Sequence, residues 1–287
     1  MFGTAKARLR GWLEGAGPGW FSVFAIGAAF SAYFCMYAFR KPFAAASYQD
    51  VTAWGVDLKT ALVISQVLGY ALSKLLGVKW LSELSPARRA GALVMLIAFA
   101  EAALLGVGAL PPHLKVVAIF FNGLPLGAVW GLVFGFLEGR RTTELLGAGL
   151  SASYIVASGA VKTVGRWVID LGVPEAWMAA VTGGLFAVPF VSAVWLLSCL
   201  PPPSAEDERA RTVRKPMRRS ERRAFVAQYA FGITTLTLLY VLLTGYRDFR
   251  DNFAFEIWSA LGYAETLSRG RTGGGRSDLE ALRQPAR

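Results

Sequence analysis

Residues 31–43 read S-A-Y-F-C-M-Y-A-F-R-K-P-F and close the first long apolar run of the chain with two adjacent cations. On a helix, Tyr33, Tyr37 and Arg40 share one face, because they are spaced four and three residues apart. Two phenols and a guanidinium on one stripe of an apolar helix indicate a bound anion or a polar cavity. The alternative is that these side chains, with Lys41, anchor the helix end at the membrane boundary. This stretch alone leaves both interpretations open.

The composition around this stretch is that of a membrane protein. Of 287 residues, 54% are hydrophobic and 17% are charged, which is too apolar for an ordinary soluble domain. The net charge of +11 lies in short connectors, so we interpret it as an orientation signal and not as a nucleic-acid surface. The two cysteines and the single histidine have no ligand spacing. Neither a metal site, a cofactor nor a disulfide framework is therefore predicted.

Seven apolar stretches are long enough to cross about 30 Å of hydrocarbon, since a helix rises about 1.5 Å per residue. The cations of the connectors gather on one side of the resulting alternating topology, which the positive-inside rule makes cytoplasmic. We therefore predict an all-α, multi-pass protein of the cell membrane with a cytoplasmic N-terminus. The seven stretches are residues 20–40, 60–80, 91–110, 115–137, 145–169, 175–199 and 224–245.

The fourth stretch, 115–137, belongs to a run in which a glycine recurs at every fourth position. Glycines in that register form one bare ridge, which lets the backbone of a neighbouring helix approach closely. We interpret them as packing residues and not as substrate contacts. They are Gly123, Gly127, Gly131, Gly135 and Gly139.

Charged side chains inside apolar runs cost about 2.5–3.5 kcal/mol each on insertion scales, so they normally face protein or water. Glu101, near the middle of 91–110, is either neutralised by an interior cation such as Lys74 or acts as a proton-coupling carboxylate. Interior cations, with Lys162 and Arg166 included, outnumber this carboxylate and favour an anion-receptive cavity. Arg166 has the alternative of reaching the outer surface. An intramembrane enzyme that uses Glu101 as acid or base is the weaker alternative, because no second interior carboxylate, nucleophile–base pair or metal cluster accompanies it. The protein is therefore not predicted to be an enzyme.

The chain changes character after residue 200. We predict a six-helix bundle over 1–200, a basic cytoplasmic linker over 201–223, the first helix of an incomplete second bundle over 224–263, and a disordered tail over 264–287. Arg247 and Asp251 are four residues apart and able to pair, which leaves Arg250 available. The tail is basic although the alternating count places it outside.

This organisation resembles the major facilitator superfamily. The resemblance is carried by the connector 77–91, G-V-K-W-L-S-E-L-S-P-A-R-R-A-G, which is similar to the signature loop of that superfamily. The opening stretch is most similar to the organophosphate:phosphate antiporters of the glycerol-3-phosphate transporter type. Their first helix ends in tyrosines spaced as Tyr33 and Tyr37, followed by an Arg-Lys-x-Phe that matches residues 40–43. Their second helix carries a Ser-Lys and then a glycine, which matches residues 73–77.

The resemblance implies a bundle of 3+3 inverted repeats and alternating-access transport of a small organic or phosphorylated anion, with the lipid bilayer as the other partner. Half a cavity alone cannot alternate its access between the two sides of the membrane, because this requires one bundle to rock against another. The chain, which stops about one helix into the second bundle, therefore pairs with a second copy or partner, or is a truncated product. A transporter-like scaffold or sensor without flux is the alternative function. The implied substrate-binding residues are Arg40, Lys74, Tyr33, Tyr37 and Lys41, with Arg247 or Arg250 from helix seven.

Overall fold

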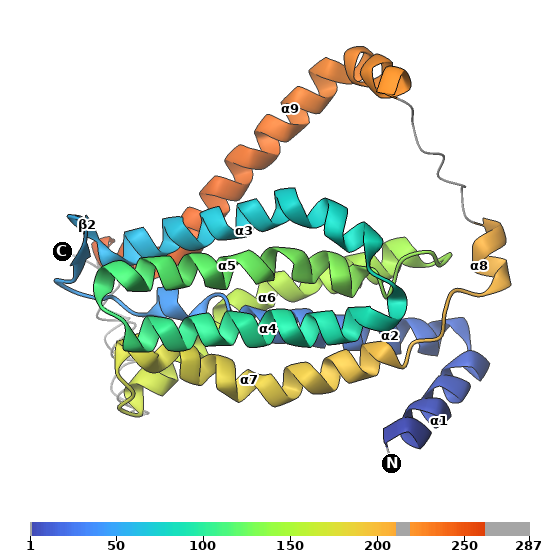
Figure 1. Ribbon diagram of the computed structural model, residues 1–287, viewed down its shortest axis with the longest axis horizontal. Coiled ribbons are helices and arrows are strands. Elements are labelled where there is room, and N and C mark those ends of the chain that lie inside the picture. The colour runs from blue at the N-terminus through green and yellow to red at the C-terminus, as the bar shows by residue number, and fades with distance from the viewer. Residues whose placement is uncertain (1, 211–218, 262–287) are drawn as a thin grey trace, which may run out of the picture. The chain divides into compact units, whose positions relative to one another are not determined.

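The computed structural model describes residues 2–210 and 219–261. Within these ranges every element is helical except one antiparallel hairpin, in which β1 (Thr52–Ala53) pairs with β2 (Val56–Asp57) (Figure 1). The chain divides into two compact units, residues 1–216 and residues 217–287. The tail predicted over 264–287, with its expected disorder, lies outside the described residues.

Most helices of the first unit follow one another with short connections, whereas η1 and the hairpin lie between α2 and α3 (Figure 1). A short helix α8 lies within the predicted linker, and α9 begins at Arg219, earlier than the predicted start at 224. The helices of the first unit are α1 (Phe2–Gly15), α2 (Pro18–Tyr37), the 3₁₀ helix η1 (Pro42–Ala45), α3 (Leu58–Glu83), α4 (Pro86–Ala109), α5 (Pro112–Phe134), α6 (Thr143–Asp170), α7 (Glu175–Ser198) and α8 (Ala205–Ala210). The second unit contains α9 (Arg219–Asn252) and α10 (Ala254–Ala260).

The described residues include six helices that are long and apolar enough to cross a membrane, namely α2, α4, α5, α6, α7 and α9. The protein is therefore a multi-pass membrane protein. Large apolar side chains stay exposed on the outer faces of these helices, with Met95 71%, Ile155 76% and Val188 75% exposed, as expected where lipid is the neighbour. The one predicted span left over, the second stretch at 60–80, corresponds to α3. This helix is not among the six, but its 26 residues extend over roughly 39 Å and it packs along α5.

Proline marks the start of several of these helices. Pro18, Pro86 and Pro112 each stand in the first turn of α2, α4 and α5, where the missing N–H would have had no partner within the helix. The boundaries after residues 17, 85 and 111 are therefore set by local chemistry. Proline also lies inside α5, at Pro125, and inside α7, at Pro189.

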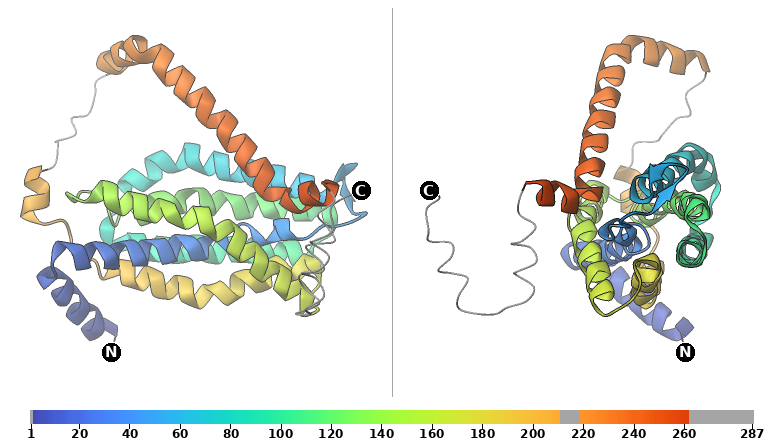
Figure 2. Two further views of the ribbon diagram at one scale, coloured as in Figure 1. Left: turned by 180° about the vertical axis from the view of Figure 1, so that it is seen from behind. Right: turned by 90° about the vertical axis from the view of Figure 1, so that its left-hand side faces the viewer.

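The bundle is built from a few close helix pairs. α5 packs against α3 and α4, α7 packs against α4, and α2 packs against α6 and α7. Figure 2 shows the side of the first unit on which α2 runs along α6 and α7. The core between them is apolar and includes fully buried Phe39, Leu62, Leu93, Ile119 and Leu126.

Glycines bring α3 and α5 into near backbone contact. A Cβ placed on Gly69 of α3 would lie 2.2 Å from the carbonyl oxygen of Phe120, and one on Gly123 would lie 2.3 Å from that of Gln66. Gly127 likewise faces Tyr70 and Ser73 of α3. The close approach of two backbones is what the glycine spacing predicts.

The other glycines of the predicted ridge are placed differently, because α5 ends at Phe134. Gly131 lies in the last turns of the helix, and Gly135 is its C-cap, where it faces the guanidinium of Arg89. Gly139 lies beyond the helix in a turn with φ of +87°, a conformation that glycine adopts without strain. The four-residue glycine spacing therefore extends beyond the end of α5, and its last two glycines do not belong to a helical ridge.

Replacing Gly123 with alanine is expected to destabilise the protein by about 1–3 kcal/mol, because the added methyl meets backbone atoms that have little room to move. Gly27 of α2 is the matched control, since a methyl there meets nothing within 4 Å. Gly27→Ala should be neutral or slightly stabilising. Thermal unfolding in detergent measures both, and equal melting temperatures for the two variants would contradict the close α3–α5 contact.

Candidate anion-binding site

The end of α2 sets the position of Arg40. The helix stops at Tyr37, and a turn follows in which the backbone N–H groups of Arg40 and Lys41 both donate to the Tyr37 carbonyl. Pro42 has no N–H with which to continue the helix, and it begins η1 instead. The helix therefore ends three residues before the approximate limit of 40 that was predicted for this span. Tyr33 and Tyr37 lie on the helix, whereas Arg40 lies in the turn after it.

Two buried amides hold this turn. Asn122 of α5 donates from Nδ2 to the carbonyl oxygens of Phe39 and Ala100, both at 2.9 Å. Gln66 of α3 donates from Nε2 to the carbonyl of Arg40 at 2.9 Å and to Oδ1 of Asn122 at 2.7 Å. Carbonyls at the end of a helix have no partner in the helix itself and are costly to leave bare in an apolar interior. The two amides satisfy them and fix the backbone at Arg40.

The side chain of Arg40 lies on the ring of Tyr70, one of the residues of α3. Its Cζ is 4.0 Å from the centroid of that ring and 5.8 Å from the centroid of the Tyr37 ring. Nζ of Lys74, one helical turn beyond Tyr70, is 5.1 Å from the same Tyr70 centroid. Both distances to Tyr70 are in the range of cation–π attraction. Cations from two separate elements therefore converge on one aromatic ring.

Tyr33 completes this group, which we call the Arg40 cluster: Tyr33, Tyr37, Arg40, Tyr70 and Lys74. The rings of Tyr33 and Tyr37 pack edge to face with centroids 5.7 Å apart. The phenol of Tyr70 interacts electrostatically with the side chains of Tyr33 and Lys74. Arg40 is 7% exposed and Tyr33 4%, whereas Lys74 is exposed. The cluster thus joins a buried guanidinium to an accessible ammonium and to phenolic hydroxyls.

This set of groups has the chemistry of an anion site. A guanidinium offers parallel donors that match two oxygens of a carboxylate or phosphate, and an ammonium adds a compact positive charge. Phenolic hydroxyls donate hydrogen bonds without adding charge. Lys41 follows Arg40 in the same turn and is buried, with 3% of its surface exposed.

The remaining predicted residues lie elsewhere. Glu101 of α4 has its carboxylate beside Gly183 of α7, and in the described part of the chain it forms no ion pair with Lys74. Arg166 donates from Nη1 to the carbonyl of Ala45 at 2.9 Å, so it fastens α6 to the end of η1.

Arg247 and Arg250 belong to α9, in the second unit. Arg247 lies 3.6 Å from the carboxylate of Asp248, its neighbour in the chain. Its pairing with Asp251 stays a prediction.

Sequence reasoning missed Tyr70 and the roles of Gln66 and Asn122, which it treated only as neutral polar residues. One signal was available for the first two. Gln66, Tyr70 and Lys74 follow one another at four-residue intervals, so they form a polar stripe on one face of α3. No comparable pattern marks Asn122, which is fully buried in α5.

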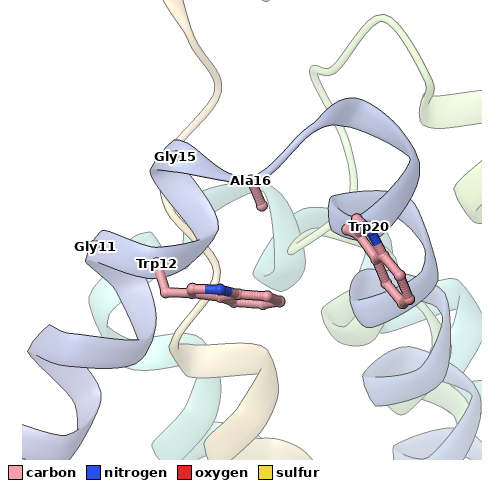
Figure 3. A pocket seen from close by; sticks show the side chains of 5 residues that line it. All are labelled: Gly11, Trp12, Gly15, Ala16 and Trp20. Carbon is pink, nitrogen blue, oxygen red and sulfur yellow. The ribbon is translucent and has the colours of Figure 1, made fainter.

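Two hollows lie at the other end of α2. One, of about 550 Å³, lies beside Gly11, Trp12 and Gly15 of α1 and Trp20 of α2 (Figure 3). The other, of about 760 Å³, is lined by residues of α1 and α2, the turn 140–142 and residues 201–207. Neither hollow is lined by a member of the Arg40 cluster.

The cations of the second hollow are held by the chain that follows α7. Arg140 donates to the carbonyl of Pro201 and lies over the ring of Phe21, with Cζ 4.6 Å from its centroid. Arg141 pairs with Glu206, and its backbone N–H donates to Asp207 at 2.9 Å. Partial desolvation opposes a fall in the pKa of Asp207, but hydrogen bonds from this N–H and from Ser204 outweigh it and lower the pKa. These groups fasten α8 to the turn between α5 and α6.

Fold and site together define an all-α, multi-pass membrane protein with a cationic and aromatic cluster where its first span ends. Over residues 42–269 the chain matches a family described as a family of unknown function, DUF5690, and it belongs to that family. The matched range includes Tyr70 and Lys74 and starts two residues after Arg40. No curated protein and no solved structure matches the chain.

Proposed function

We propose that this protein is a secondary transporter, or the N-terminal portion of one, that binds a small organic or phosphorylated anion at the Arg40 cluster. The observation that carries the proposal is the convergence of Arg40 and Lys74, from separate elements, on the ring of Tyr70. The proposal is supported by the electrostatic cost of holding two cations in this arrangement, which a bound anion would offset.

A guanidinium inside a helix bundle loses its hydration, and a second cation nearby adds repulsion. The faces of Tyr70 and Tyr37 offset part of that cost, since each such contact contributes about 0.5–2 kcal/mol. An anion bound between the two cations would offset more. A carboxylate or a phosphate matches the fork of Arg40 with two oxygens, and a phosphate leaves a third oxygen for Lys74.

Transport requires the cluster to face the two sides of the membrane in turn. In the proposed mechanism the helices α2 to α7 form one half of an alternating-access transporter, built as 3+3 inverted repeats with its N-terminus in the cytoplasm. The second half is a second copy, a partner, or a longer continuation of the bundle that α9 begins. The cell membrane is the proposed location.

Flux through reconstituted vesicles tests the proposal. The purified protein is placed in liposomes, and uptake of labelled glycerol 3-phosphate, inorganic phosphate and a small dicarboxylate is followed with each anion, or none, trapped inside. Saturable uptake of one of these anions, above that of empty liposomes, is the expected result. If the protein shows neither saturable uptake nor saturable binding of any of the three in detergent, the proposed function is wrong.

A transporter-like sensor is the second candidate. It is favoured by the location of both described hollows at the opposite end of α2 from the cluster. A sensor binds the anion in detergent but gives no uptake in vesicles, so the same two measurements separate the candidates.

A further inference from the structure

Glu101 lies in the middle of α4, at the place where that helix meets α7 and the turn after α2. Its Oε2 atom is buried and has no hydrogen-bond partner. A Cβ placed on Gly183 of α7 would lie only 2.2 Å from this oxygen and 3.1 Å from the ring of Phe39. The carboxyl group thus fills the space that the missing side chain of Gly183 leaves.

The charged groups on neighbouring elements are directed elsewhere in the described part of the chain. On α5, Lys115 donates to the carbonyl of Val107 at 2.8 Å, and His113 is exposed at the start of the helix. On α7, Glu175 accepts hydrogen bonds from Ser47 and Tyr48, and after α2 the guanidinium of Arg40 lies over Tyr70. An ionised carboxylate at Glu101 would lack a countercharge, so this packing suits the protonated acid.

A direct route connects Glu101 to the Arg40 cluster. The Nδ2 group of Asn122 donates to the carbonyl of Ala100, the residue before Glu101, and to the carbonyl of Phe39, the residue before Arg40. A change in the backbone position of Ala100 would therefore act on the same amide that binds the carbonyl of Phe39.

We infer that Glu101 is a proton-binding residue whose protonation is coupled to anion binding at the Arg40 cluster, so that the proton and the anion bind together. This inference rests on the proposed function and specifies its coupling ion. An anion at Arg40 disfavours a second negative charge nearby, so anion binding favours protonation of Glu101. By reciprocity, the protonated form binds the anion more tightly.

The sign of the pH dependence follows from this linkage. Anion affinity is highest where Glu101 is protonated, and it falls as the pH rises through the titration of that group. For a single coupled proton the dissociation constant rises by at most about tenfold per pH unit.

The test is equilibrium binding of glycerol 3-phosphate in detergent from about pH 5 to about pH 9, together with proton uptake measured in buffers of different ionisation enthalpy. The wild-type chain is compared with Glu101→Gln, which mimics the protonated acid, and with the exposed control Glu144→Gln. The titration of the phosphate itself is common to all three. We expect that Glu101→Gln binds the anion with uptake of as much as one proton fewer than wild type. Its anion affinity should also lose the part of the pH dependence that this proton causes. Glu144→Gln should behave as wild type.

Equal slopes and equal proton uptake in wild type and Glu101→Gln, with binding intact, would overturn this inference and leave the proposed function standing. Absence of anion binding in wild type would overturn the proposed function. Infrared spectra recorded without anion would then show whether Glu101 binds a proton. A protonated-carboxyl band that titrates and is missing in Glu101→Gln supports a proton-binding site. Absence of that band overturns it.

A pair of glycine variants tests the geometry without changing the acid. Gly183→Ala places a methyl where Oε2 lies, so it should displace the carboxyl group and shift the pH profile of binding. Gly184→Ala is the matched control, because the nearest carboxylate oxygen is 4.0 Å from its added methyl. If anion binding has the same pH profile in both variants and in wild type, the assignment of the proton to the carboxyl group of Glu101 is contradicted.

Discussion

Arg40→Ala is expected to weaken anion binding by about 100-fold or more and to abolish measurable uptake. A charge-assisted hydrogen bond contributes about 1.5–3 kcal/mol, and a bidentate guanidinium contact supplies two of them. The variant also loses the charge that the rings of Tyr70 and Tyr37 now hold in place. Binding of labelled glycerol 3-phosphate in detergent and uptake by liposomes measure the two effects separately.

Because Arg40 is buried, its variants need a check of folding and two milder companions. Arg40→Lys keeps the charge but loses the fork, so an intermediate loss of about tenfold is expected. Lys74→Gln changes an exposed side chain, carries little risk of misfolding, and should also lose about tenfold. Arg88→Gln, an exposed cation at the start of α4, is the control and should bind as wild type. Wild-type affinity in a folded Arg40→Ala protein would remove the cluster as the binding site.

Asn122→Ala is expected to cost about 2–4 kcal/mol of stability, the largest loss among the single substitutions considered. The side chain is fully buried and takes part in hydrogen bonds to Phe39, Ala100 and Gln66. An interhelical hydrogen bond in a membrane protein contributes about 0.6 kcal/mol on average, and the carbonyls left without a donor add to the loss. Thermal unfolding in detergent measures this change.

Ser192→Ala is the matched control for that substitution. Its hydroxyl is exposed and donates to a carbonyl of its own helix, that of Val188, so its removal should change stability by less than about 0.5 kcal/mol. Gln66→Ala should fall between the two, because it removes two of the hydrogen bonds but leaves Asn122 bound to Phe39 and Ala100. Similar melting temperatures for Asn122→Ala and Ser192→Ala would show that the network contributes little.

The apolar runs were enough to predict the helical membrane class, because a span requires a long apolar stretch and proline often fixes where it begins. The end of α2 was not predictable in the same way. The helix stops three residues before the predicted limit at 40, and amides from α3 and α5 bind the carbonyls of Phe39 and Arg40 in the turn that follows. The hairpin 52–57 was also missed, since two-residue strands give no periodic signal.

For the candidate site, the sequence indicated that Arg40 and Lys74 belong together but did not supply the ring between them. The juxtaposition depends on which face of α3 is turned to α2, and this is decided by the glycines that bring α3 against α5. The same limit applies to Glu101. A carboxylate in an apolar run suggests a cation as its neighbour, whereas the structure places it against a glycine, which shows in sequence only as a packing residue.

The amide that closes α2 has a consequence for how this protein is made. Asn122 reaches back over 83 residues of chain to the carbonyl of Phe39. While the ribosome is still delivering α3 and α4 to the bilayer, that carbonyl lacks its donor and the arginine after it has no fixed direction. The hydrogen bonding after the first span is therefore completed only when α5 arrives, so the Arg40 cluster lacks this support in a nascent chain that is shorter.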